Sequence, residues 1–202
     1  MQHKIIETED VVIRFAGDSG DGMQLTGTLF ADASALYGNE ISTFPDYPAE
    51  IRAPQGTVSG VSGFQVHIGS VKINTPGDFC DVLVAMNPAA LKANVKWAKP
   101  TATIIVDADT FDEKGIQRAG YATQDPIAEL NIQDRNLILA PITTLTKESL
   151  KDSGLDNKSI LRCKNMFTLG MCFFIFNKSL DYTYEYLEKK FKKKPNLIAP
   201  NK

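Results

Sequence analysis

Four short apolar runs recur along the chain, and segments with helical spacing separate them. The runs occupy residues 11–15, 82–86, 102–106 and 137–140. Uninterrupted apolar runs of this length are typical of parallel strands that are covered on both faces. Strands that alternate with helices in this way predict an α/β fold, a three-layer α/β/α Rossmann-like domain with right-handed crossovers.

The first crossover carries the clearest signals. The first apolar run leads into a glycine-rich segment at residues 17–22, here called the glycine turn, and a helix is predicted from there to about Tyr37. Gly38 and Asn39 supply the C-terminal stop of that helix. Helical spacing assigns its buried face to Thr26, Phe30, Ala33 and Tyr37.

Three later helices are also predicted. One begins with Asn87 as N-cap and Pro88 at the first helical position, and runs to about residue 98. Residues 158–177 predict a mostly buried helix. A last helix carries an apolar stripe made of Leu180, Tyr184, Leu187 and Phe191.

Residues 64–68 alternate apolar and polar side chains, and Gly69-Ser70 separates them from a second short run at residues 71–73. Two strands joined by a two-residue loop that begins with glycine predict a type II′ hairpin. We therefore expect a mostly parallel mixed sheet with an antiparallel hairpin at one edge. His67 occupies a polar position of that edge strand, where a surface role is expected.

The end of the chain changes character. A lysine run closes the last helix and is expected to be a hydrated cationic helix end: Lys189, Lys190, Lys192, Lys193 and Lys194. After Pro195 the sequence loses its periodicity. Residues 1–194 therefore predict a single domain, and residues 195–202 predict a linker to a following domain.

Composition narrows the class of protein. With 202 residues, 43% of them hydrophobic, the chain can bury the core of one large domain. Its formal charge of −2 gives no basic field for nucleic acid. The polar residues 1–10 lack an export segment, and the apolar stretch at residues 171–176 is too short to cross a membrane.

The cysteines exclude two kinds of site within this chain alone. Cys80, Cys163 and Cys172 form no CxxC pair, so they cannot build a four-thiolate iron–sulfur cluster or zinc site. An odd cysteine count without a signal peptide favours a reducing compartment, and a cytoplasmic location is expected.

The glycine turn raises the question of a nucleotide, because a strand, a glycine-rich turn and a helix start together form an anion site. Its glycines are spaced GxxGxG rather than GxGxxG, and Asp18 and Asp21 would repel a phosphate. Gly20-Asp21-Gly22 is also similar to the opening of the thiamine diphosphate signature. Residues 47–50 lack the asparagines that would complete it. The plain alternative is a tight turn whose Asp and Ser side chains cap the following helix.

Residues 44–57 form the second dense segment, with three prolines, two acids and Arg52. Loops at strand ends often carry function. The guanidinium of Arg52 could bind a carboxylate or a phosphate, or pair with Glu50 or a neighbouring chain. The following Gly60-Val61-Ser62-Gly63 lacks GxSxG spacing, and the sequence supports no Ser–His–Asp or Cys–His arrangement. We therefore assign this chain no acid, base or nucleophile.

Three segments in order resemble the gamma module of 2-oxoacid:ferredoxin oxidoreductases. They are the glycine turn with its helix, residues 47–54, and residues 60–69. Lys164-Asn165-Met166 also resembles that module. The likeness covers about residues 10–190, and it is closest to the version fused ahead of the alpha module in 2-oxoglutarate:acceptor enzymes.

The resemblance implies a part in a thiamine diphosphate enzyme. Such an enzyme oxidatively decarboxylates a 2-oxoacid, passes the acyl group to coenzyme A and sends electrons through iron–sulfur clusters to ferredoxin. Thiamine diphosphate, Mg²⁺ and the cluster are then expected in the alpha domain and the beta subunit, with none bound by this chain alone. The module would be inactive by itself. Its expected contacts with coenzyme A or the alpha domain are Ser19, Gly20, Asp21, Gly22 and Arg52.

Two alternatives remain open at this point. One is a stand-alone Rossmann-like module that binds a nucleotide in the first crossover, and the other is a structural dimerisation domain. Binding of NAD(H), ATP or FAD at micromolar concentrations by the isolated chain would favour the first. The sequence does not reveal which 2-oxoacid or which electron carrier would be used.

Overall fold

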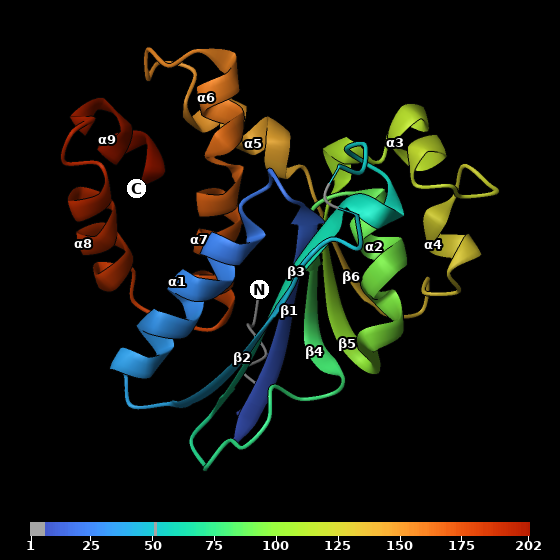
Figure 1. The fold of residues 1–202 in the computed structure, drawn as a ribbon, viewed down its shortest axis with the longest axis horizontal. Coiled ribbons are helices and arrows are strands. Elements are labelled where there is room, and N and C mark those ends of the chain that lie inside the picture. The colour runs from blue at the N-terminus through green and yellow to red at the C-terminus, as the bar shows by residue number, and fades with distance from the viewer. Residues whose placement is uncertain (1–6, 51) are drawn as a thin grey trace, which may run out of the picture.

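The computed structural model describes residues 7–50 and 52–202, and it contains a six-stranded sheet in the order β2-β3-β1-β4-β5-β6 (Figure 1). Strands β1, β4, β5 and β6 are parallel, whereas β3 is antiparallel to both β1 and β2. The predicted mostly parallel mixed sheet is confirmed. The strands are β1 (Asp10–Asp18), β2 (Glu40–Asp46), β3 (Val61–Gly69), β4 (Cys80–Ala85), β5 (Ala98–Asp107) and β6 (Asn136–Ala140).

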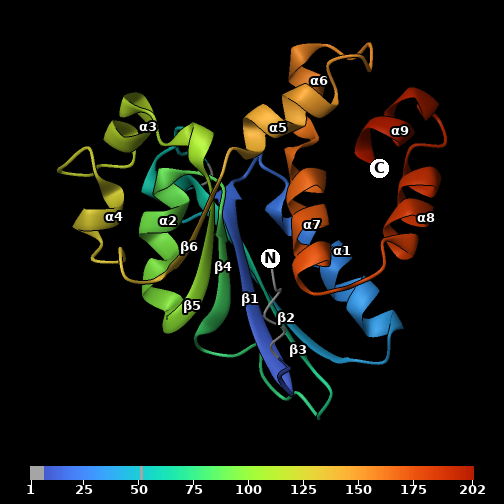
Figure 2. The same cartoon turned by 180° about the vertical axis from the view of Figure 1, so that it is seen from behind.

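Helices cover both faces of the sheet, as Figure 2 shows from behind. One face carries α1 (Met23–Leu36), α7 (Lys164–Ile175) and α8 (Asp181–Lys190), and the other carries α2 (Pro88–Asn94), α3 (Glu113–Arg118) and α4 (Pro126–Glu129). The remaining helices are α5 (Ile142–Ser149), α6 (Asn157–Arg162) and α9 (Ile198–Asn201). Four 3₁₀ turns complete the list: η1 (Val58–Gly60), η2 (Val95–Trp97), η3 (Ala108–Thr110) and η4 (Pro195–Leu197).

Two hydrophobic cores result, one on each face of the sheet. The first is centred on Phe15, Phe30 and Phe173, whose rings pack in sequence at centroid distances of 5.9 and 5.4 Å. The second contains Leu83 of β4 and Leu91 of α2. Alternate side chains of β1 enter opposite cores, which explains why its central residues, apart from Arg14, are apolar.

The predicted end of the first helix and the predicted start of the second are confirmed, whereas the second helix ends four residues before the predicted residue 98. Helix α1 ends at Leu36, and Gly38 follows with φ of 81°. Tyr37 lies beyond the helix and is 53% exposed, so its predicted place on the buried face is wrong. Asn87 caps α2 by accepting the N–H of Ala90 at 2.8 Å, and α2 gives way to the 3₁₀ turn η2 after Asn94.

The predicted hairpin is wrong. Residues 71–73 form no strand, and β3 pairs instead with β1 on one side and β2 on the other. Strand β2 was not predicted because it is an edge strand whose mostly exposed side chains mix polar residues with Pro45. The antiparallel pair at the sheet edge is therefore β2 with β3.

His67 is consequently not an edge residue. Its side chain is only 13% exposed, so the expected surface role is also wrong. Its Nε2 lies 2.8 Å from Oδ2 of Asp10, and its Nδ1 lies 2.7 Å from the carbonyl oxygen of Thr75. The ring thus joins β3 to β1 and to the loop before β4.

The C-terminal third differs from prediction in two places. The single helix expected over residues 158–177 is divided at Cys163 into α6 and α7, and Phe174 is 81% exposed rather than buried. Residues after 194, expected as an irregular linker, fold into η4 and α9. A domain boundary at residue 194 stays a prediction.

The other expectations for this region agree with the structure. Leu187 is buried on α8, and Leu180 and Phe191 pack against the first core. The lysines of residues 189–194 are exposed at the end of α8. All three cysteines are buried and free. Among residues 7–50 and 52–202, no helix is both long and apolar enough to traverse a bilayer.

Candidate functional site

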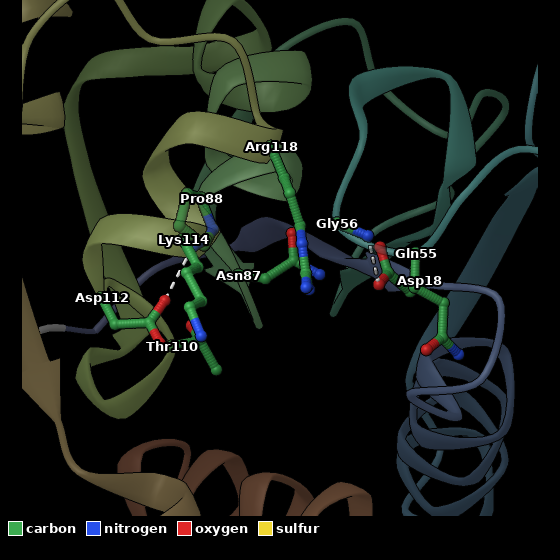
Figure 3. A pocket seen from close by; sticks show the side chains of 10 residues that line it. Asp18, Gln55, Gly56, Asn87, Pro88, Thr110, Asp112, Lys114 and Arg118 are labelled. Atoms are coloured by element: carbon green, nitrogen blue, oxygen red, sulfur yellow. Dashed lines mark hydrogen bonds between the residues drawn. The ribbon is translucent and has the colours of Figure 1, made fainter.

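The candidate site lies where the connections of the sheet reverse direction. From the carboxyl end of β1 the chain enters α1 on one face, and from the carboxyl end of the adjacent β4 it enters α2 on the other. In open α/β sheets, ligands bind in the crevice that this reversal opens. A cavity of about 330 Å³ occupies that position (Figure 3).

Four segments build the cavity: the end of β1, the loop before β3, the start of α2, and the stretch from η3 through α3. Figure 3 shows that residues far apart in the sequence converge here. The lining consists of Asp18, Gln55, Gly56, Asn87, Pro88, Thr110, Asp112, Lys114, Gly115 and Arg118.

Asn87 forms the floor and is held from two sides. Its Oδ1 caps α2, and its Nδ2 donates to Oδ2 of Asp21 at 3.4 Å. The carbonyl of Pro88 accepts a hydrogen bond of 3.0 Å from the hydroxyl of Tyr121. The start of α2 is therefore fixed relative to the glycine turn by Asn87, and relative to the segment after α3 by Tyr121.

Asp18 joins the glycine turn to the loop before β3. Its Oδ2 accepts the N–H of Gly56 at 2.9 Å. Its Oδ1 is buried and has no hydrogen-bond partner in the part of the chain that the structure describes. Burial raises the pKa of Asp18, although the N–H of Gly56 opposes the shift.

Asp21 does not cap α1, which corrects the plain interpretation of the turn. Gly22 is the N-cap with φ of 73°, and no side chain caps this helix. The left-handed backbone at Gly22 turns the chain so that the Asp21 carboxylate points back and accepts the N–H of Asp18 at 2.9 Å. Burial raises the pKa of Asp21, and the nearby Lys164 ammonium lowers it in part.

The glycine turn is covered by the motif at the start of α7. A Cβ added to Gly22 would lie 2.6 Å from Nδ2 of Asn165. Next to it, Lys164 reaches Oδ2 of the fully buried Asp107 at 3.3 Å. Two of the segments that carried the family resemblance thus lie in contact, although about 140 residues separate them.

Two cations face the cavity from α3. Lys114 and Arg118 are four residues apart and therefore share one helix face. Figure 3 shows Arg118 extending toward Asn87, with Lys114 on the side of Thr110. No salt bridge within residues 7–50 and 52–202 involves either side chain. They are therefore available to an anion.

Sequence reasoning missed these two cations. The segment begins with Asp112, which caps α3 by accepting the N–H of Gly115 at 2.7 Å, and it carries no recognised motif. One sequence feature of this segment relates to the site, namely Gly115, which lies between Lys114 and Arg118. A Cβ at Gly115 would collide with the carbonyl oxygen of Thr110, so only glycine allows α3 to lie this close to η3.

The five residues that the sequence predicted as contacts with coenzyme A or the alpha domain differ in their position relative to the cavity. None of Ser19, Gly20, Asp21 and Gly22 lines the cavity. Asp21 is linked to it through the hydrogen bond from Asn87, and Ser19 and Gly20 are exposed in the glycine turn. Arg52 is exposed in the loop before β3, does not line the cavity, and forms no salt bridge with another described residue.

The chemistry that this arrangement offers is anion binding. Two cations and the amides of Asn87 and Gln55 line the cavity, together with the carboxylates of Asp18 and Asp112. These carboxylates accept the N–H groups of Gly56 and Gly115. The hydroxyl of Thr110 is already used, because it donates to the carbonyl of Asp107 at 2.7 Å. Paired cations at this spacing suit a phosphate or carboxylate group. Among the described residues there is no cluster of His, Cys, Asp or Glu suited to a metal ion.

Comparison with known proteins identifies the family. Residues 12–202 match the family model described as pyruvate ferredoxin/flavodoxin oxidoreductase. The chain belongs to this family. The resemblance to 2-oxoacid:ferredoxin oxidoreductases that the motifs carried is therefore confirmed.

Two relatives in the pyruvate ferredoxin/flavodoxin oxidoreductase family are similar over most of this chain. The 2-oxoglutarate oxidoreductase subunit KorA of Mycobacterium tuberculosis is 45% identical over 193 residues, which cover 96% of this chain and 29% of KorA. The 2-oxoglutarate synthase subunit KorC of Methanothermobacter marburgensis is 32% identical over 140 residues, covering 68% and 67%. The chain thus spans less than a third of the length of KorA.

Solved structures give the same picture. A 2-oxoglutarate:ferredoxin oxidoreductase from Magnetococcus marinus, solved with 2-oxoglutarate, coenzyme A and succinyl-CoA, matches with a TM-score of 0.72 and 30% identity over 96% of this chain and 29% of its own. The gamma subunit of a keto/oxoacid ferredoxin oxidoreductase from Geobacter sulfurreducens matches with a TM-score of 0.58 and 19% identity, covering 95% and 98%. The second match supports the fold.

Proposed function

We propose that this chain is the gamma domain of a 2-oxoacid:ferredoxin oxidoreductase of the 2-oxoglutarate type. The observation that carries the proposal is the 45% identity to KorA over 96% of the chain. The complex would convert a 2-oxoacid and coenzyme A to acyl-CoA and carbon dioxide, and would pass two electrons to ferredoxin. An alpha domain, in the same polypeptide, and a beta subunit would complete the enzyme.

The residues of this chain do not fit thiamine diphosphate or an iron–sulfur cluster. The Asp21 carboxylate, which opens the incomplete thiamine motif, accepts hydrogen bonds from the N–H of Asp18 and the amide of Asn87. Burial raises the pKa of the Cys172 thiol to about 12 and that of Cys80 to about 11, which disfavours the thiolate that a cluster needs. Both cofactors, with Mg²⁺, are accordingly proposed to be held by the partner domains.

Coenzyme A is the ligand proposed for the cavity. It carries a diphosphate and a ribose phosphate, and the cavity presents Lys114 and Arg118 without carboxylate partners among the described residues. Ser19, Gly20 and Arg52 are exposed and lie outside the lining of the cavity, where they would contact coenzyme A or the alpha domain. The attraction between phosphate and the two cations supports this assignment. The Asp18 and Asp112 carboxylates, which also line the cavity, are engaged by backbone N–H groups.

The contribution of this domain is binding and orientation. Lys114 and Arg118 would hold the phosphates, so that the thiol end of coenzyme A extends toward the partner domains. The rigid floor at Asn87 would fix the direction of approach. Thiamine diphosphate supplies the decarboxylation chemistry when it is bound elsewhere in the complex. No proton transfer is assigned to a side chain of this domain.

The test uses the longer polypeptide, which is expressed in the cytoplasm of the host cell and purified with its beta subunit. We expect reduction of ferredoxin that depends on both 2-oxoglutarate and coenzyme A. Arg118→Ala should raise the KM for coenzyme A roughly tenfold to a hundredfold, because a charge-assisted hydrogen bond contributes about 1.5–3 kcal/mol. The KM for 2-oxoglutarate should stay unchanged. Arg162→Ala, on α6 outside the cavity, is the matched control.

A stand-alone nucleotide-binding module remains the second candidate, because the cavity and its two cations also suit a nucleotide phosphate. Calorimetric titration of the 202-residue chain with ATP, NAD(H) and FAD separates the two proposals. Micromolar binding of one of these nucleotides, with no 2-oxoglutarate oxidation by the longer protein, would favour the second candidate.

A further inference from the structure

A second cavity, of about 570 Å³, lies outside the candidate site and shares no residue with it. It is a groove between α7, the end of α5 and the end of the chain. Lys202 is its one charged lining residue, and Lys202 is neutralised by Glu188 at 2.6 Å. The groove is lined by Thr146, Ser149, Leu150, Cys163, Met166, Phe167, Gly170, Met171, Phe174, Ala199, Pro200, Asn201 and Lys202.

The wall formed by α7 is an apolar helix face, on which Phe167 and Met171 also pack in part against the first core. Phe167, Met171 and Phe174 recur at helical spacing, on the side opposite the buried Leu169 and Phe173. Phe174 is 81% exposed, and the adjoining Ile175 is 43% exposed. A large aromatic side chain so exposed beside an apolar groove is typical of an interaction surface.

Gly170 supplies an independent observation at the centre of this face. A Cβ added there would meet nothing within 4 Å. Glycine in a helix interior is destabilising relative to alanine, and no contact within the described residues requires it here. A missing side chain between Phe167 and Phe174 leaves a notch in the helix surface. Such a notch accepts a ridge of side chains from a second helix.

We infer that the groove receives an apolar helix of the polypeptide that follows Lys202 in the longer protein. The inference rests on the proposed function, in which this chain is one domain of a longer polypeptide. Ala199, Pro200 and Lys202 form the wall opposite α7, so a segment that follows Lys202 in the longer protein would start at the groove. A segment tethered there has a high effective concentration at the groove. The apolar lining selects an apolar occupant.

The length relations agree with this occupant. The chain spans 29% of KorA and 29% of the Magnetococcus marinus protein. Under the proposed function, more than two thirds of the longer polypeptide lies outside this domain and can supply the occupant. The groove combines the most exposed large apolar side chain on a described helix, Phe174, with a wall formed by residues 199–202.

Cysteine labelling in the longer protein, purified with its partner subunit, tests the inference. The Phe174→Cys variant should react with a maleimide at least tenfold more slowly than the Leu36→Cys variant. Leu36 is a matched control because it is 67% exposed at the end of α1, away from the groove. The three native cysteines are buried and set the background rate. In the 202-residue chain, both variants should react rapidly.

A second variant distinguishes a blocked groove from local unfolding of α7. Gly170→Leu should leave the melting temperature of the 202-residue chain unchanged or raised, because the added side chain meets open space. In the longer protein it should lower the melting temperature by several degrees.

Equal labelling of the two cysteine variants in the longer protein would overturn the inference. So would slow labelling of Phe174→Cys in the 202-residue chain that depends on concentration, since this would identify a second copy as the occupant. A longer protein that oxidises 2-oxoglutarate but labels equally at both positions leaves the proposed function standing and removes only this inference.

Discussion

Nζ of Lys164 lies 3.3 Å from Oδ2 of Asp107, and this contact ties the start of α7 to the carboxyl end of β5. Asp107 is fully buried, and it also accepts hydrogen bonds from the N–H and the hydroxyl of Thr143 at 3.1 and 2.6 Å. The neighbouring Asn165 covers Gly22. One short motif therefore connects β5, the first turn of α5 and the glycine turn, which together support the candidate site.

Removal of the lysine should be strongly destabilising. Lys164→Met leaves the Asp107 carboxylate buried without its cation, and the free energy of unfolding should fall by about 3–5 kcal/mol. Urea denaturation followed by circular dichroism measures the change. The double variant Lys164→Met with Asp107→Asn should recover part of the loss, because it removes the uncompensated charge. A loss below about 1 kcal/mol for Lys164→Met would contradict this account of the pair.

The pH dependence of stability should reveal Asp21. Burial raises its pKa above the usual 3.8, so the folded protein binds this proton more tightly than the unfolded chain. The resulting stability is present below pH 3.8 and is lost as the pH rises through the raised pKa. Asp21→Asn retains a side-chain oxygen but cannot ionise. It should therefore be more stable than the parent protein at pH 7, with the difference shrinking toward pH 3.8.

Asp156 offers a control of opposite sign. The backbone N–H and hydroxyl of Ser159 hold the pKa of Asp156 below 3.8. Asp156→Asn should thus lower stability at pH 7, and the difference should disappear as the pH falls through that lowered pKa. Chemical denaturation at several pH values checks both variants. Parallel pH profiles for Asp21→Asn and Asp156→Asn would count against the burial argument.

The loop before β3 should depend on a buried arginine. Arg14 is 5% exposed, and it donates to Asn94 at 2.6 Å, to Gln65 at 3.2 Å and to the Asp46 carboxylate. Asp46→Ala should cost about 2 kcal/mol, the usual contribution of a charge-assisted hydrogen bond. It should also speed proteolysis within residues 47–57. Glu40→Ala, at the exposed start of the same strand, should change neither quantity.

The sequence was sufficient for the parts of the fold that local patterns determine. Apolar runs located the four parallel strands, and the cap of Asn87 located α2. Strand β2 escaped because its pairing with β3 is a long-range interaction, while its own residues are exposed and include Pro45. The false hairpin followed from the same cause, since β3 was given a partner from its nearest neighbour in sequence.

The candidate site was predictable only in part. The glycine turn was recognised because its residue types are unusual. The sequence identified Asp18 and Asp21 there, but not the hydrogen bonds that they accept. Lys114 and Arg118 could not be identified, since nothing local distinguishes them from other helix cations. They become part of a site only because Gly115 lets α3 pack against Thr110 in η3, the turn after β5. A functional role that arises from packing of distant segments leaves little trace in local spacing.

Comparison of Gly22 with Gly38 separates the cost of a side-chain collision from the cost of a left-handed backbone. Both have left-handed backbones, with φ of 73° and 81°. A Cβ at Gly38 would meet nothing within 4 Å, whereas one at Gly22 would meet Asn165. Gly38→Ala should therefore cost only the backbone penalty, about 1–2 kcal/mol. Gly22→Ala should cost more, roughly 3 kcal/mol, because α7 must also shift.

Urea denaturation of the two alanine variants measures this difference. Adding Asn165→Ala to Gly22→Ala should return the cost of the glycine substitution toward that of Gly38→Ala, since the colliding side chain is then absent. The coupling energy between positions 22 and 165 should be at least about 1 kcal/mol, as expected for residues in direct contact. Equal costs for Gly22→Ala and Gly38→Ala, or additive effects at positions 22 and 165, would mean that α7 does not hold the glycine turn in place.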